Sequence, residues 1–74
     1  MKIEQIIYLT DIAQTHSMTQ SAQRLFISQQ ALSFSIKKLE EEFGATLLSR
    51  SNHGVELTEE GKRFLQQAGS MVTL

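Results

Sequence analysis

The chain has 74 residues, of which 41% are hydrophobic, so it supports one small domain with a single core. It contains no cysteine, which excludes disulfides, thiolate metal sites and a cysteine nucleophile. No apolar run is long enough for a membrane span and no signal-peptide core is present, so we expect a cytoplasmic protein. No catalytic triad, carboxylate pair, phosphate-binding loop or metal-ligand cluster is visible, so we expect neither an enzyme nor a cofactor.

The charges are unevenly distributed along the chain. The net charge of −1 does not by itself favour nucleic acid or a membrane as a partner. Residues 12–39, however, contain no Asp or Glu, and a second acid-free stretch, residues 43–55, contains Arg50. These stretches form a positive face if they are exposed together, although such segregation also arises by chance in a short chain.

Two helices are predicted in the first third of the chain. Residues 3–15 have apolar side chains at helical spacing. The main apolar stripe consists of Ile3, Ile6, Leu9 and Ala13. Tyr8 and Ile12 form a second apolar edge, which usually indicates a second packing partner. After a polar break, a short helix over residues 19–26 begins with Thr19 as a plausible N-cap.

The longest helical pattern covers residues 29–43, between Ser28 as N-cap and Gly44 as a left-handed C-cap. Its apolar stripe consists of Leu32, Ile36, Leu39 and Phe43, and the opposite side carries Gln30, Ser33, Phe34 and Lys37. We expect Phe34 to be exposed there; the alternative is a differently phased helix that buries its ring. The acids at residues 40–42 lie where the helix dipole disfavours anions, so we expect solvated side chains that are tolerated or repel something.

The remaining residues predict a hairpin and a final helix. Short apolar runs on both sides of the turn-like residues 51–54 predict a small two-stranded hairpin at about residues 47–57. Thr58 then caps a helix over residues 59–74. Its apolar stripe exceeds what one small domain needs, which predicts a homodimer. The residues expected to pair the two chains are Phe64, Leu65, Ala68 and Val72, with Tyr8 and Ile12 as a further surface.

The second and third helices, joined through Phe26-Ile27-Ser28, have the spacing of a helix-turn-helix. The third helix presents Gln29, Gln30 and Ser33 near its start, and their amide and hydroxyl groups can hydrogen-bond base edges. Lys37, further along the same side, can reach a phosphate or a guanine. We therefore interpret this helix as one that enters the major groove of DNA, although polar faces are also common on ordinary soluble helices.

Four blocks of the sequence resemble the LysR-type transcriptional regulators. They are SMTQSAQRLFISQQALS (17–33), IKKLEEEFG (36–44), LLSR (47–50) and LTEEG (57–61), which together span essentially the whole chain. The resemblance implies a mainly α, winged helix-turn-helix domain over residues 1–58 that binds double-stranded DNA, with residues 29–43 as its recognition helix. Residues 59–74 would begin a truncated linker helix that pairs two chains. A small-molecule effector would act only through a ligand-binding domain absent from these residues.

The resemblance also implies roles for individual residues. Gln29 and Ser33 would contact bases, and Arg50 would contact the DNA backbone near the wing. Thr19 and Ser28 match positions that commonly touch phosphate. The wing tip, residues 51–54 with Asn52 and His53, would lie at the minor groove.

The sequence departs from the family pattern in ways that remove positive charge from the DNA side. Phe34 stands where the family usually has Arg, and its ring could contact a thymine methyl group. The wing also has fewer basic residues than usual. His16 and His53 are isolated and are expected to be surface histidines, although His53 could reach a phosphate. The alternative function is a winged-helix protein-interaction module that uses Phe34 and the acidic end of the third helix.

Overall fold

Four helices and one β-hairpin follow one another in the predicted order. The computed structural model describes the backbone of residues 1–72 and the side chains of residues 1–68. The elements are α1 (Ile3–Thr15), α2 (Met18–Leu25), α3 (Gln29–Phe43), β1 (Leu48–Ser51), β2 (Gly54–Leu57) and α4 (Glu59–Val72). The last two residues of the predicted final helix, 73–74, lie outside the described residues. The predicted fold class, mainly α with a small two-stranded hairpin, is confirmed.

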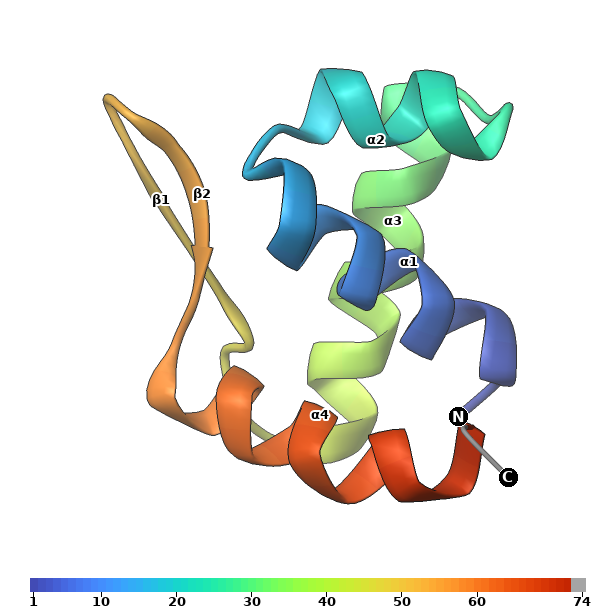
Figure 1. Ribbon diagram of the computed structural model, residues 1–74, viewed down its shortest axis with the longest axis vertical. Helices are drawn as coiled ribbons and strands as arrows, with labels where there is room; N and C mark the ends of the chain where they lie inside the picture. Colours follow the sequence, from blue (N-terminus) through green and yellow to red (C-terminus); the bar gives the residue numbers. More distant parts are fainter. Residues whose placement is uncertain (73–74) are drawn as a thin grey trace.

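The elements are arranged around α3, the longest helix (Figure 1). Helices α2 and α4 lie at opposite ends of α3, and α1 crosses it between them (Figure 1). The hairpin extends from one side, with its tip toward the end that carries α2 (Figure 1). None of the described helices is both long enough and apolar enough to cross a membrane.

Local sequence determines most of the helix ends. Helix α2 begins at Met18 because Ser17 is its N-cap: the Ser17 backbone is extended and its Oγ accepts the Gln20 N–H at 3.1 Å. The prediction that Thr19 caps this helix is therefore wrong. The other predicted caps are confirmed, namely Ser28 before α3, Gly44 after α3 and Thr58 before α4.

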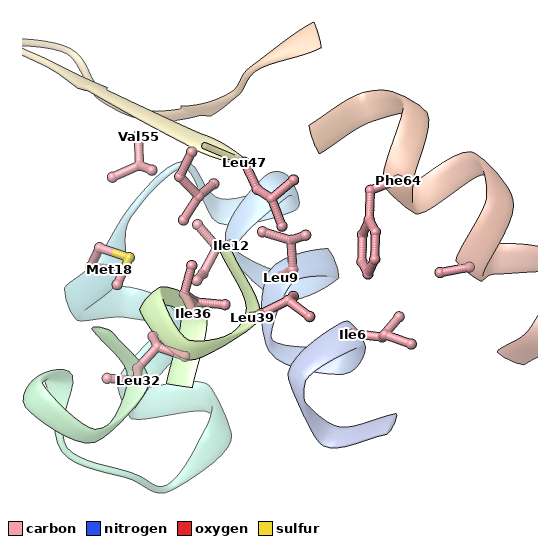
Figure 2. Packing of buried hydrophobic residues seen from close by; sticks show 13 residues of the cluster. Ile6, Leu9, Ile12, Met18, Leu32, Ile36, Leu39, Leu47, Val55 and Phe64 are labelled. Carbon is pink, nitrogen blue, oxygen red and sulfur yellow. The ribbon is translucent and has the colours of Figure 1, made fainter. Parts of the chain in front are cut away.

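The core contains side chains from every helix and strand. Its buried hydrophobic residues are Ile6, Leu9, Ile12, Met18, Ala22, Leu32, Ile36, Leu39, Leu47, Leu48, Val55, Phe64 and Ala68. Figure 2 shows Leu9, Leu39 and Phe64 pointing into the space between α1, α3 and α4. The ring of Phe64 also packs edge-on against Phe43, with ring centroids 5.1 Å apart. Packing between distant segments therefore holds α4 on the body of the domain.

The core corrects several predictions about dimerisation. Ile12 is fully buried in the monomer, whereas Ile3, expected in the main stripe of α1, is 67% exposed. Phe64 and Ala68 are also buried in the monomer core, so these residues and Ile12 are not available to pair two chains. Tyr8 and Leu65 are half-buried at the edge of the core. The side chain of Val72 lies outside the described residues.

The hairpin is joined to the turn between α1 and α2 through His16. The two strands are antiparallel, with Leu48 opposite Leu57 and Ser51 opposite Gly54. The Val55 N–H donates to the His16 carbonyl oxygen at 3.1 Å, and His16 Nδ1 donates to the Val55 carbonyl oxygen at 3.1 Å. His16 is exposed, as predicted, but it pairs with β2 as a further strand residue would. This structural role was missed at the sequence level.

Glu40 holds the start of β1. Its Oε2 accepts the N–H groups of Leu47 at 2.7 Å and Leu48 at 3.2 Å. The prediction that all three acids of residues 40–42 are solvated is therefore wrong for Glu40, whose carboxylate satisfies two backbone donors next to the core. Glu41 and Glu42 are exposed, as predicted.

The close approach of β2 to His16 predicts that Gly54 is intolerant of a side chain. Gly54 has φ +116°, and a Cβ at this position would overlap the His16 carbonyl oxygen. Gly54→Ala should therefore lower the free energy of unfolding by about 2–4 kcal/mol in a urea titration, because it combines backbone strain with a displaced strand.

Gly44→Ala is the matched control. Gly44 has φ +82°, and no atom lies within 4 Å of a Cβ placed there, so this substitution adds only left-handed strain of about 1–2 kcal/mol. A loss at Gly54 no larger than the loss at Gly44 would contradict the contact between β2 and His16.

Candidate nucleic-acid interface

The turn between α2 and α3 exposes the start of α3. Phe26 has a left-handed backbone with φ 59°, and its side chain is 93% exposed. The next residue, Ile27, packs against the core and donates its N–H to the Ala22 carbonyl at 3.1 Å. Gln29 and Gln30 follow at the first two positions of α3, and both are exposed. The first turn of α3 therefore faces outward.

Five of the predicted DNA-contacting side chains lie on one surface. Gln29, Gln30 and Ser33 line an open hollow of about 480 Å³ at the start of α3. Ser33 also borders a neighbouring hollow of about 190 Å³ together with Lys37 and Arg50. We call this surface, formed by Gln29, Gln30, Ser33, Lys37 and Arg50, the α3–β1 face.

A side-chain hydrogen bond joins the two elements of the α3–β1 face. Arg50, in the middle of β1, donates from Nη2 to Ser33 Oγ on α3 at 2.9 Å. Among the described residues, neither Arg50 nor Lys37 forms an ion pair with a carboxylate. The side chain of Arg24, by contrast, pairs with Asp11 at 3.0 Å. The cations that remain unpaired on this face are those of α3 and β1.

Thr19 and Ser28 lie at the starts of α2 and α3. Ser28 Oγ accepts the Ala31 N–H at 3.0 Å, which leaves the Ser28 hydroxyl proton for an outside acceptor. Thr19 lies in the first turn of α2, and its hydroxyl donates to Gln29 Oε1 at 2.9 Å. Thr19 is therefore attached to the α3–β1 face through Gln29.

Phe34 is exposed but does not belong to the α3–β1 face. Its side chain is 63% exposed, so the alternative of a differently phased helix that buries the ring is wrong. The ring lines a different hollow, about 450 Å³ in volume, between α1 and α3, with Tyr8 and Ile27 among its other walls. Lys38 Nζ lies 5.5 Å from the ring centroid, within range of a cation–π contact. Phe34 therefore lies on the flank of α3 that faces α1.

The tip of the hairpin is polar and exposed. Asn52 and His53 form the turn between the strands, and the His53 N–H donates to Ser51 Oγ at 3.2 Å. The tip lies toward the same end of the molecule as α2 (Figure 1). The predicted wing is thus present as a β-hairpin, and its tip, residues 51–54, carries no Lys or Arg.

These features define a winged helix-turn-helix protein: α2 and α3 form the helix-turn-helix, and the β1–β2 hairpin is the wing. Residues 3–62 match the family described as bacterial regulatory helix-turn-helix protein, lysR family. The match covers most of the chain, and the chain belongs to this family.

Two curated relatives are HTH-type transcriptional regulators that are longer than this chain. YcgK of Bacillus subtilis (strain 168), which is described as uncharacterized, is 43% identical over 72 residues; the match covers 97% of this chain and 22% of YcgK. BudR of Klebsiella aerogenes is 40% identical over 74 residues; the match covers 100% of this chain and 52% of BudR. The chain thus spans about a fifth to a half of the lengths of these relatives.

Two similar solved structures are DNA complexes. The CbnR_DBD–DNA complex has a TM-score of 0.91 and 34% identity, over 99% of this chain and 84% of that chain. The complex of BenM_DBD with catB site 1 DNA has a TM-score of 0.90 and 36% identity, over 99% of this chain and 82% of that chain. The backbone of the present chain therefore closely resembles those of two proteins in complex with DNA.

Proposed function

We propose that residues 1–58 are the DNA-binding domain of a LysR-type transcriptional regulator, with α3 in the major groove and the wing tip at the minor groove. Residues 59–74 would begin the linker helix. The observation that carries this proposal is the hydrogen bond between Arg50 and Ser33, because it places a wing cation on the surface formed by the start of α3. The similarity to the CbnR and BenM complexes with DNA supports the same orientation.

The chemistry of the α3–β1 face fits DNA better than it fits an ordinary solvated helix. Gln29, Gln30 and Ser33 would contact base edges, while Arg50, Lys37 and Ser28 would contact phosphates or, for Lys37, a guanine. The net charge of −1 does not oppose this role, because residues 12–39 carry no acid and the acids lie in other parts of the chain. Phe34, beside the α3–β1 face, would contact a thymine methyl group, and Asn52 and His53 would approach the minor groove.

We also propose that the chain forms a homodimer, as two-fold DNA sites require of paired helix-turn-helix domains. Tyr8 and Leu65 keep their predicted roles in this proposal because each is only half-buried. Ile3 and Ile7 replace Ile12 on α1: they lie one helical turn apart and are 67% and 45% exposed. The complete regulator would act in the cytoplasm and respond to a small-molecule effector through a separate domain.

Substitutions on the α3–β1 face should affect DNA binding in two different ways. Gln29→Ala should cost about 1–3 kcal/mol on a duplex selected from a random pool and should blur the preference at one base position. Arg50→Ala should instead weaken binding to all sequences and reduce the slope of log K against log[salt] by about one unit, because one phosphate contact is lost. Fluorescence anisotropy over a range of salt concentrations measures both effects.

Helix α4 supplies matched controls for both substitutions. Arg63 and Gln66 are exposed there, and α4 lies at the opposite end of the molecule from α2. Arg63→Ala removes the same charge as Arg50→Ala and should leave the binding curve unchanged, as should Gln66→Ala. If Gln29→Ala and Arg50→Ala also leave binding unchanged, or if binding is insensitive to salt, the protein-interaction module is the better explanation.

The dimer proposal predicts that Ile3→Lys lowers the dimer fraction measured by sedimentation equilibrium, because it places a charge in an apolar contact. Gln14→Lys, at another exposed position of α1, is the control and should leave the dimer fraction unchanged. A wild-type chain that stays monomeric at the highest concentration, with and without DNA, would contradict the proposal.

A further inference from the structure

Two exposed hydrogen bonds on the α3–β1 face orient side chains rather than stabilise the fold. Thr19 Oγ1 donates to Gln29 Oε1 at 2.9 Å, and Arg50 Nη2 donates to Ser33 Oγ at 2.9 Å. Both bonds are exposed, so water competes for the same groups and their net contribution to stability is small. Their main consequence is which atoms of Gln29 and Ser33 remain free.

Both bonds occupy acceptor atoms. A glutamine amide has one acceptor oxygen and one NH₂ group, so when Thr19 holds Oε1, the NH₂ group becomes the free end of Gln29. The Ser33 oxygen accepts from Arg50, so its single hydroxyl proton points elsewhere and can be donated. The guanidinium of Arg50 has no acceptor at all. The free groups of Gln29, Ser33 and Arg50 are therefore donors.

We propose that Thr19 is a specificity-determining residue, which fixes the amide of Gln29 so that this position donates to the DNA and selects guanine. Guanine presents only acceptors, N7 and O6, on its major-groove edge. Adenine presents N7 as an acceptor but N6 as a donor, and a glutamine reads it bidentately only when the amide oxygen is free to accept. The inference rests on the proposed function, because it assumes that α3 enters the major groove.

Arg50 acts on Ser33 in the same direction. By donating to Ser33 Oγ, it leaves the Ser33 hydroxyl as a donor one helical turn along α3 from Gln29. Gln29 and Ser33 together then present a donor edge, which disfavours a cytosine N4 or adenine N6 amino group opposite them.

This role of Thr19 conflicts with the phosphate contact that the family resemblance implies. A threonine hydroxyl has one proton, and a phosphate oxygen only accepts hydrogen bonds. Thr19 therefore donates either to Gln29 or to a phosphate, but not to both. The two roles have different consequences: a phosphate contact affects every DNA sequence equally, whereas a fixed amide affects the base at one position.

The test is selection of bound duplexes from a random pool by the wild-type chain and by Thr19→Val and Thr19→Ser. Valine has nearly the shape of threonine but lacks the hydroxyl, and serine retains it. Gln29→Ala identifies the base position that Gln29 reads, because only there does the preference disappear. Circular dichroism melting checks that each variant is folded.

The wild type and Thr19→Ser should select guanine at that position. Thr19→Val frees the amide to rotate, so its preference should move toward adenine, with the guanine-to-adenine ratio falling by about 3- to 10-fold, the size of one net hydrogen bond. The affinity for random DNA and its salt dependence should be the same for all three proteins.

Two other outcomes overturn the inference in distinguishable ways. If the wild type selects a sequence and Thr19→Val selects the same base with uniformly lower affinity, Thr19 contacts phosphate and does not orient Gln29. If Gln29→Ala changes the base preference and Thr19→Val has no effect, the amide is not held by Thr19. If the wild type selects no sequence at all, it is the proposed function itself that fails.

Discussion

A two-stranded hairpin is only marginally stable by itself in water, so the position of the wing depends on its polar attachment to the helices. His16 supplies one attachment, since its backbone carbonyl and its ring both bond to Val55. Glu40 supplies the other, through the N–H groups of Leu47 and Leu48. Buried Leu48 and Val55 then fix which side of the hairpin faces the core. The wing is therefore part of the folded body of the domain.

Helix α3 connects this attachment to the proposed DNA contacts. Its C-terminal half carries Glu40, which holds β1, and its N-terminal half carries Gln29 and Ser33 on the exposed side. Because β1 is fixed on α3, Arg50 lies within hydrogen-bonding distance of Ser33. A change that loosens the start of β1 would thus also displace the cation of the α3–β1 face. Stability and proposed DNA recognition share one helix.

Local sequence patterns predict much of this structure, but contacts between distant residues do not follow from them. Periodicity and capping residues such as Ser28 and Gly44 locate the helices because these signals act within a few residues. The phase of α1 was less predictable: Ile3 and Ile12 are both apolar, and only the packing of α3 and α4 decides which is buried. Likewise, the roles of His16 and Glu40 depend on where the hairpin returns to the helices, and no local pattern encodes this. Among the proposed DNA contacts, the polar face of α3 was visible in the sequence, whereas the bond that brings Arg50 to it was not.

Native-state hydrogen exchange tests most directly whether the wing is fixed to the helical body. The amides of Val55 and Leu47 are bonded to His16 and Glu40, whereas the His53 amide at the tip is bonded only to Ser51 Oγ. The account predicts that Val55 and Leu47 exchange with an opening free energy within about 1 kcal/mol of that of Ile36 in α3, while His53 exchanges much faster. Exchange of Val55 and Leu47 as fast as that of His53 would contradict it, because the hairpin would then open independently of the helices.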